Sequence, residues 1–315
     1  MLKALVTDDR YRQYKIERDI LTPAGIELVV NENGADLAEL AADMDALLVN
    51  LAKVDAPVIQ KLNRCKVISR YGVGYDNVDL IAARAKGISV TNVPDYCKND
   101  SAEHTLALML TASRRISIHD RHVRAGEWNI TAGNPVYRMT GRTYGIIGYG
   151  RTGKNVHRLI KGFNFREIFV CSPSTDEQEL RKNGARKADL HTLLRESDFI
   201  SCHVPLNPAT ERMIGAKEFA LMKPNAVFVN TARGKVIDET ALIAALTEKR
   251  IAMAGLDVFE NEPIAKDNPL RTLENVVLTD HQAWYSEESI VELKRRVAEN
   301  VKAVLTGEGA ASIVN

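Results

Sequence analysis

Short apolar runs alternate with amphipathic stretches along the first hundred residues of the chain. The apolar runs predict strands at residues 2–7, 26–30, 46–49, 66–69 and 88–91. The stretches between them predict helices at residues 37–42, 56–62 and 78–85. Such alternation is typical of a parallel sheet that helices cover on both faces. No glycine-rich phosphate loop follows the first strand, so this half is not expected to bind a nucleotide.

The alternation resumes at Thr143, after a predicted helix at residues 100–115 and a predicted polar loop at residues 119–141. The later apolar runs predict strands at residues 167–171, 199–203, 226–230, 252–258 and 276–278. Predicted helices lie at residues 153–161, 189–195, 217–221 and 239–248. Residues 286–305 carry apolar side chains at helical spacing and predict a long helix that returns to the first domain.

The pattern therefore predicts an α/β protein with two doubly wound parallel-sheet domains. Residues 1–98 and 286–315 are expected to form one domain, and residues 99–285 are expected to form the other. The length of 315 residues suits two domains, and 45% apolar with 26% charged residues is typical of a globular protein.

Charge and hydropathy exclude several classes of partner. The formal net charge of +1 gives no reason to expect nucleic acid. No apolar run approaches the roughly 20 residues that span a bilayer, and the first residues do not resemble a signal peptide. We therefore expect a cytoplasmic protein without a membrane partner.

The cysteines suggest neither a metal site nor a disulfide framework. None of them pairs at C-x-x-C spacing, and histidines, cysteines and carboxylates do not cluster at ligand spacing, so no metal is expected. They are expected to be small buried side chains in a reducing compartment, at Cys65, Cys97, Cys171 and Cys202.

A glycine-rich turn in the middle of the chain carries the first functional signal. The residues from Thr143 to Gly153 read as a buried strand that turns sharply into a helix. Gly148 would allow the tight turn, Gly150 would let a pyrophosphate approach the backbone, and Gly153 would let the helix pack on the strand. The helix N-terminus then favours an anion. This arrangement predicts a dinucleotide-binding domain.

The end of the next strand bears on the choice of cofactor. Sites specific for NAD usually carry an acidic residue there, about 20 positions after the glycines, which binds the ribose 2′-OH. Ser172 occupies that position here, 19 residues after Gly153. A serine hydroxyl can serve a 2′-OH or a 2′-phosphate and repels neither, so both NAD and NADP stay open.

Ionisable side chains follow the predicted strands further along the chain. They are Arg233 in Asn230–Gly234, Asp257 and Glu262 in Gly255–Pro263, and His281 in the segment after the last strand. In open parallel sheets the carboxyl ends of the strands border the ligand crevice. Reduction of a 2-oxo acid needs a cation for the carboxylate and carbonyl, a proton donor, and a carboxylate beside that donor. Arginine, histidine and an acid supply these in turn.

An ordered series of motifs runs over nearly the whole chain. It comprises Arg70–Asp79, Asn92–Pro94, Ala102–Thr105, the glycine-rich turn, His203–Leu206, Asn230–Gly234, Val236–Asp238, Gly255–Pro263 and the His281 segment. With this series the chain resembles the D-isomer-specific 2-hydroxyacid dehydrogenases. The run His281–Glu287 is most similar to the subgroup that contains the C-terminal-binding-protein corepressors.

The resemblance implies a fold, a reaction and partners. A Rossmann NAD(P)-binding domain would be inserted into a flavodoxin-like substrate domain. Hydride would pass between NAD or NADP and C2 of a small 2-oxo or D-2-hydroxy acid. A homodimer is expected, with residues 121–137 as the candidate contact. The alternative is a corepressor-like binding protein gated by NAD(H), against which the chain shows no basic patch or evident recruitment segment.

The resemblance also implies roles for individual residues. Arg233 would bind the substrate carboxylate and carbonyl, His281 would exchange the proton, and Glu262 would pair with His281. Backbone groups near Val73 and Gly74 would hold the substrate carboxylate, and Trp284 would line the pocket or pack in the core. The cofactor would meet Arg151 and Thr152 at the pyrophosphate, Ser172 at the ribose, His203, Val204 and Pro205 along the adenosine, and Thr231, Ala232 and Asp257 at the nicotinamide half.

One departure from the family pattern lies beside the histidine. The family usually has proline there, and this chain has Asp280. That extra carboxylate is expected either to face solvent or to act on His281.

Overall fold

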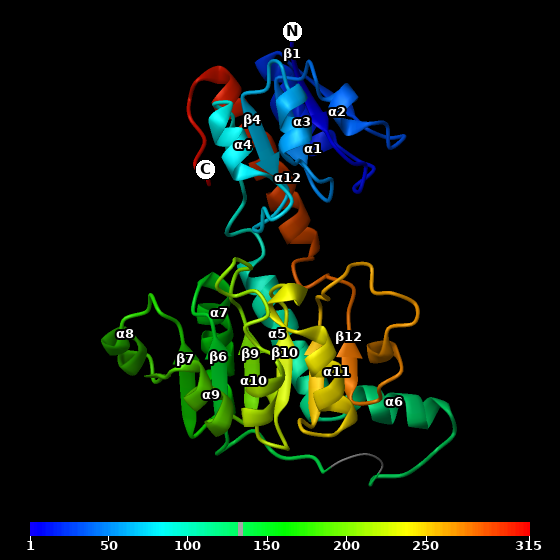
Figure 1. Ribbon diagram of the computed structural model, residues 1–315, viewed down its shortest axis with the longest axis vertical. Helices are drawn as coiled ribbons and strands as arrows, with labels where there is room; N and C mark the ends of the chain where they lie inside the picture. Colours follow the sequence, from blue (N-terminus) through cyan, green and yellow to red (C-terminus); the bar gives the residue numbers. More distant parts are fainter. Residues whose placement is uncertain (132–134) are drawn as a thin grey trace. The chain divides into compact units, whose positions relative to one another are not determined.

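A computed structural model describes residues 1–131 and 135–315, which fold into two compact units (Figure 1). Unit 1 contains Met1–Cys97 and Ser286–Asn315, and unit 2 contains Lys98–Tyr285. Each unit is built on its own parallel sheet, which confirms the predicted class of two α/β domains.

The sheet of unit 1 has five parallel strands in the order β2-β1-β3-β4-β5. The strands are β1 (Leu2–Val6), β2 (Ile26–Val30), β3 (Ala46–Val49), β4 (Val67–Arg70) and β5 (Ser89–Thr91). Their inner residues are almost entirely apolar and buried, as expected for a parallel sheet with both faces covered.

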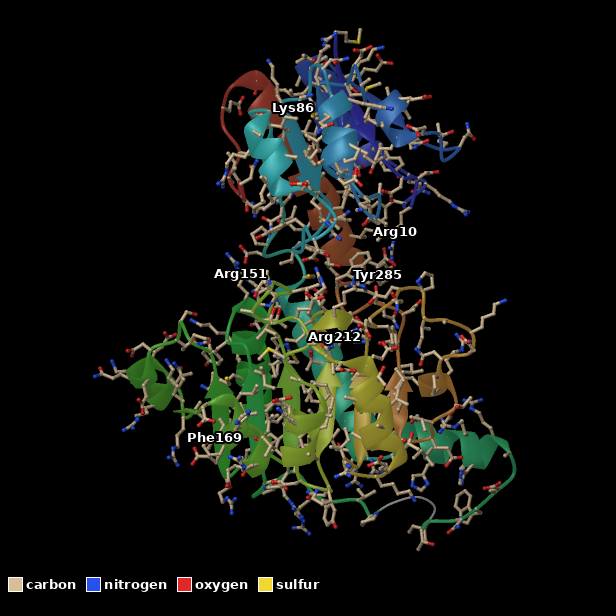
Figure 2. All side chains as sticks on the ribbon, in the orientation of Figure 1. Arg10, Lys86, Arg151, Phe169, Arg212 and Tyr285 are labelled. Carbon is tan, nitrogen blue, oxygen red and sulfur yellow. The ribbon has the colours of Figure 1, made fainter. Side chains whose placement is uncertain are left out.

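Five helices belong to unit 1: α1 (Lys15–Leu21), α2 (Leu37–Leu40), α3 (Ala56–Lys61), α4 (Leu80–Ala85) and α12 (Glu287–Thr306). Three of them begin at aspartates whose side chains accept a backbone N–H three residues on, which satisfies an orphan donor of the first turn. Lys86, labelled in Figure 2, donates to three carbonyls at the end of α3. Helix α12 packs against α1 and β4 of the same unit.

The sheet of unit 2 has seven parallel strands in the order β12-β11-β10-β9-β6-β7-β8. They are β6 (Thr143–Ile147), β7 (Glu167–Cys171), β8 (Arg186–Lys187), β9 (Phe199–Cys202), β10 (Val227–Asn230), β11 (Met253–Leu256) and β12 (Val276–Leu278). The order reverses at β6, so the glycine-rich turn that follows β6 lies at the topological switch point where such sheets bind ligands.

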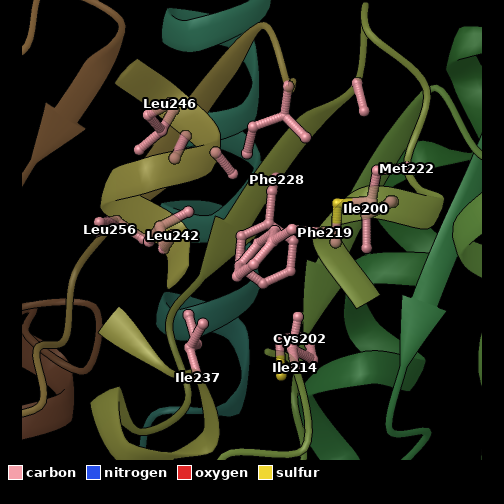
Figure 3. Packing of buried hydrophobic residues seen from close by; sticks show 14 of the residues in the cluster. Ile200, Cys202, Ile214, Phe219, Met222, Phe228, Ile237, Leu242, Leu246 and Leu256 are labelled. Atoms are coloured by element: carbon pink, nitrogen blue, oxygen red, sulfur yellow. The ribbon is translucent and has the colours of Figure 1, made fainter. Parts of the chain in front are cut away.

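The helices of unit 2 are α5 (Lys98–Ser113), α6 (Ile116–Arg124), α7 (Arg151–Ile160), α8 (Glu177–Lys182), α9 (Leu190–Glu196), α10 (Ala216–Leu221) and α11 (Glu239–Thr247). Helix α5 contacts α7, β10 and β11. Figure 3 shows the core around β9, β10, α10 and α11, where the rings of Phe219 and Phe228 meet edge to face, 5.8 Å apart. This apolar layer fixes the strand ends that carry the polar residues.

The prediction of a loop over residues 119–141 is wrong in its first part. Residues 119–124 belong to helix α6 (Ile116–Arg124), in which only Ile118 is buried. Its other apolar side chains, Ile116 and Val123, are exposed and the remaining residues are polar or charged, so the sequence pattern did not reveal the helix. Part of the predicted dimer contact at residues 121–137, namely residues 132–134, lies outside the described residues.

Candidate active site

The glycine-rich turn follows β6, and its three glycines have different reasons to be glycine. Gly148 has a φ of +89°, and a Cβ there would lie 2.7 Å from the backbone of His203. A Cβ on Gly153 would lie 2.2 Å from the carbonyl oxygen of Gly148. A Cβ on Gly150 would meet nothing within 4 Å. The protein's own packing therefore requires the outer two glycines, and the middle one borders open space.

That open space lies where helix α7 begins. Gly150 is the N-cap, and Arg151 and Thr152 form the first turn; Figure 2 labels Arg151. The N–H groups of a helix's first turn lack intrahelical partners and favour an anion. These residues therefore fit the pyrophosphate of a dinucleotide.

Ser172, predicted to meet the ribose, follows β7 and is only 8% exposed. The Thr175 hydroxyl donates to Ser172 Oγ at 2.9 Å. The position predicted for the ribose thus has two neutral hydroxyl groups, those of Ser172 and Thr175.

His203, Val204 and Pro205 follow β9, beside the glycine-rich turn. Burial lowers the pKa of His203 to about 3, so the ring is neutral. Its Nε2 lies 2.9 Å from Ser201 Oγ. A neutral imidazole here leaves the positive helix terminus as the feature that attracts phosphate.

An imidazole and a carboxylate meet after the last two strands of the sheet. His281 Nδ1 lies 2.6 Å from Glu262 Oε2, and the Phe259 N–H donates to Glu262 Oε1 at 2.9 Å. Burial would raise the pKa of Glu262, but the His281 hydrogen bond and charge, the Phe259 N–H and the Arg233 charge together lower it. Glu262 is therefore ionised at neutral pH, and His281 Nδ1 is the donor in this pair.

Arg233 follows β10, and its neighbour Gly234 allows it to approach the segment that carries Glu262. A Cβ on Gly234 would lie 1.8 Å from the carbonyl oxygen of Phe259, so the two backbones are in direct contact there. Arg233 thus lies near enough to Glu262 for its charge to act on that carboxylate. The structure brings together Arg233, Glu262 and His281, which lie far apart in the sequence.

Asp257 is fully buried behind this group and holds the backbone that carries His281. Its carboxylate accepts the N–H groups of Gln282 and Ala283, each at 2.9 Å, and the Thr279 hydroxyl at 2.6 Å. The His281 N–H donates to the backbone carbonyl of Asp257. Burial would raise the pKa of Asp257, but its hydrogen bonds with His104, Thr279, Ala283 and Gln282 lower it.

This anchoring explains an uncommon backbone conformation. His281 has a φ of +58°, in the left-handed region that costs a residue with a Cβ about 1 kcal/mol or more. Three consecutive N–H groups directed at Asp257 offset that cost, and Trp284 Nε1 donates to the His281 carbonyl at 2.9 Å. Sequence reasoning assigned Asp257 to the cofactor and missed its hold on this turn, since no local motif signals a contact made through backbone N–H groups.

The remaining predicted residues lie as follows. Thr231 and Ala232 follow β10, and Thr231 Oγ1 lies 2.8 Å from Thr105 Oγ1 on helix α5. Val73 and Gly74 lie in unit 1, after β4, where the Asn92 amide donates to the Val73 carbonyl. Their role toward substrate stays a prediction. Asp280 is exposed to solvent.

Comparison with known proteins identifies the family. The NAD-binding domain model of the D-isomer specific 2-hydroxyacid dehydrogenases matches residues 106–283. A glyoxylate reductase of Korarchaeum cryptofilum is 43% identical over 89% of this chain and 85% of its own. The chain therefore belongs to the D-isomer-specific 2-hydroxyacid dehydrogenase family, which confirms the resemblance, and it is an NAD(P)-dependent enzyme.

Solved structures agree over nearly the full length. An acyclic imino acid reductase in complex with NADPH and D-Arg has a TM-score of 0.90 at 29% identity and covers 100% of both chains. The D-lactate dehydrogenase of Aquifex aeolicus, complexed with NAD and lactic acid, has a TM-score of 0.87 at 28% identity, over 97% of this chain and 96% of its own. These neighbours bind the two nicotinamide cofactors that the sequence left open.

Two further observations concern residues 1–131 and 135–315. None of the helices there combines the length and the apolar character needed to cross a bilayer. No three histidine, cysteine or carboxylate side chains in those ranges lie close enough to share a metal ion.

We predict that Asp257→Asn lowers the free energy of unfolding by about 2–3 kcal/mol at pH 7, since hydrogen bonds to a charged group contribute about 1.5–3 kcal/mol each. The folded-state pKa of Asp257 is lowered, so its stabilisation is fully present above the unfolded-state pKa of about 3.9. It is lost as pH falls through the lower folded-state pKa. Urea unfolding at pH 7, 5 and 3.5 should therefore show the difference shrinking toward acid.

The exposed Asp280 supplies the matched control. Asp280→Asn should change the free energy of unfolding by less than about 0.5 kcal/mol at each pH, as is usual for surface substitutions. An Asp257→Asn variant as stable as the native chain at pH 7 would contradict the anchoring role.

Proposed function

We propose that this chain transfers hydride between NAD(P)(H) and C2 of a small D-2-hydroxy or 2-oxo acid, with Arg233, Glu262 and His281 as its catalytic residues. The observation that carries the proposal is the 2.6 Å pair of His281 and Glu262, with the charge of Arg233 acting on the same carboxylate. A cation, a proton carrier and an ionised acid together meet the needs of 2-oxo acid reduction.

Each side chain has a distinct task in this scheme. Arg233 binds the substrate carboxylate through its planar fork of donors and polarises the C2 carbonyl. His281 donates a proton from Nε2 to the carbonyl oxygen during reduction and takes it back during oxidation. Glu262 fixes the Nδ1–H tautomer and stabilises the positive charge that the ring carries with its second proton. The bound nicotinamide supplies or accepts the hydride.

The residues around the glycine-rich turn would hold that cofactor. We assign the pyrophosphate to Gly148, Gly150, Arg151, Thr152 and Gly153, which border the open start of α7. Ser172 would meet the ribose, His203, Val204 and Pro205 the adenosine, and Thr231, Ala232 and Asp257 the nicotinamide half. The hydroxyls of Ser172 and Thr175 carry no negative charge of their own against a 2′-phosphate, which supports use of NADP as well as NAD.

The substrate is a small 2-oxo or D-2-hydroxy acid in this proposal, and Val73, Gly74 and Trp284 would complete its site. The names of the relatives supply candidates, among them glyoxylate and lactate. The first test is a panel of glyoxylate, hydroxypyruvate, pyruvate and phenylpyruvate, each with NADPH and with NADH, followed by the absorbance of the reduced cofactor.

We expect turnover of at least one of these acids, and NADPH should be used as well as or better than NADH because no acidic residue occupies the Ser172 position. No turnover with any 2-oxo acid would favour the alternative of a cofactor-gated binding protein. A kcat/KM for NADPH far below that for NADH would contradict the NADP assignment alone.

With the substrate identified, His281→Ala and Arg233→Ala should each lower kcat/KM by at least about 100-fold, since general acid catalysis by a placed histidine is typically worth about 10²–10⁴. The control is Asp280→Asn, whose side chain is exposed beside His281 and should leave kcat/KM within about twofold. A loss of less than about fivefold in either alanine variant would reject the assignment of that residue.

We also propose that the chain forms a homodimer through the segment after helix α6. Trp128 is 92% exposed and Ile130 is 93% exposed. Large apolar side chains exposed together mark interaction surfaces. Light scattering during chromatography should therefore give twice the 34.9 kDa of one chain, and Trp128→Ser with Ile130→Asn should reduce it to one. A native mass of 34.9 kDa would exclude the dimer.

A further inference from the structure

We propose that His104 is a positioning residue of this active site. Its imidazole supports, through the Thr279 hydroxyl, the buried Asp257 carboxylate that holds His281 in its left-handed conformation. The proposal rests on the proposed function, because it assigns His104 an effect on the proton exchange at His281.

The hydrogen bonds run in one direction from His104 to Asp257. Thr279 has a single hydroxyl proton, and it goes to Asp257 Oδ1 at 2.6 Å. The Thr279 oxygen therefore accepts from His104 Nε2, which lies 3.0 Å away, so Nε2 carries the proton. The same Nε2 lies 3.4 Å from Asp257 Oδ1, and the His104 bond is among those that lower the pKa of Asp257.

Helix α5 reaches this position because β11 has a glycine against it. A Cβ on Gly255 would lie only 3.0 Å from the Cβ of Leu108, so helix and strand pack backbone to side chain there. His104 precedes Leu108 by four residues and shares its helix face. Asp257 follows the end of the same strand. The close approach at Gly255 thus directs His104 to the strand end that carries Asp257.

The next residue on the helix supports the other half of the site. The Thr105 hydroxyl donates to the Ser101 carbonyl at 2.7 Å, so the hydroxyl of Thr231, 2.8 Å away, donates to Thr105. Thr231 lies two residues before Arg233. Adjacent side chains of one helix therefore contact both segments that supply the catalytic residues, one leading to His281 and the other to Arg233.

Loss of the His104 contact should affect the chemical step more than binding. The Thr279 hydroxyl and Asp257 would lose a donor, and the turn at His281 would be held less firmly. A catalytic group misplaced by about 1 Å can cost about 100-fold in rate, so a partial loosening should lower kcat about tenfold. KM should stay within about twofold, because Arg233 is held by other contacts.

The test uses the full-length chain and three variants. His104→Leu removes the donor, and His104→Gln keeps an N–H near the position of Nε2. His191→Leu is the control, because His191 is also a histidine on a helix of unit 2 and its more exposed side chain lies on α9, a different helix from His104. The measurements are kcat and KM, melting temperature, and the pH titration of the His281 ring by NMR of the histidine-labelled chain without substrate, assigned with His281→Gln.

We expect His104→Leu to lower kcat about tenfold and to change the titration of His281, and His104→Gln to recover kcat to within about threefold. His191→Leu should leave both unchanged. A His104→Leu variant with kcat within about twofold and an unchanged titration would overturn the proposal. So would a loss that His104→Gln does not recover, since it would show a role in packing alone.

If His104→Leu does not fold, Thr279→Val tests the proposal in its place. It interrupts the same hydrogen-bond chain and also removes the Thr279 donor to Asp257, so it should lower kcat about tenfold or more, and its combination with His104→Gln should lower kcat no further. Independent, additive losses would refute the link. If the native chain reduces none of the panel acids, the proposed function fails, whereas the titration of His281 still tests the contact from His104.

Discussion

The buried carboxylate of Asp257 holds the turn on which the rest of the site depends. The carboxylate accepts hydrogen bonds from the N–H groups of residues 282 and 283 and from the Thr279 hydroxyl. The backbone carbonyl of Asp257 accepts the N–H of His281. An ionised group this deep in the protein is stable only when several donors surround it. The same donors fix a left-handed histidine that points its ring at Glu262. The buried charge of Asp257 and the backbone conformation of His281 are therefore stabilised by the same set of hydrogen bonds.

The second constraint is a contact between two backbones. Gly234 and Phe259 approach so closely that no side chain fits between them, and this contact places Arg233 beside the segment that ends in Glu262. Gly255 does the same for helix α5 and strand β11. The proposed catalytic residues are thus brought together by glycines that carry no chemistry themselves. Their value lies in letting charged neighbours from separate segments come within electrostatic range.

The family membership and the site indicate the same class of reaction, but some residues of this chain differ from the usual family pattern. Membership explains the dinucleotide turn and the order of the strands. This chain has Ser172 where sites specific for NAD usually carry an acidic residue, and it has an aspartate before His281. Relatives with the same fold carry names that refer to glyoxylate, lactic acid and an imino acid. The selectivity of this chain therefore depends on side chains rather than on the fold.

The sequence by itself determined the α/β class, most strands and the glycine-rich turn, and it predicted the three residues that we propose as catalytic. These signals are local or follow one motif at a time: buried parallel strands are apolar runs, and a tight turn needs glycine. The sequence pattern did not predict helix α6, because this helix buries a single residue. Only the tertiary structure decided that Asp257 anchors the His281 turn and that His104 reaches it. The Asp257 side chain meets backbone N–H groups 25 and 26 residues further on, and the His104 contact joins two side chains 175 residues apart. Such pairings leave no periodicity in the chain.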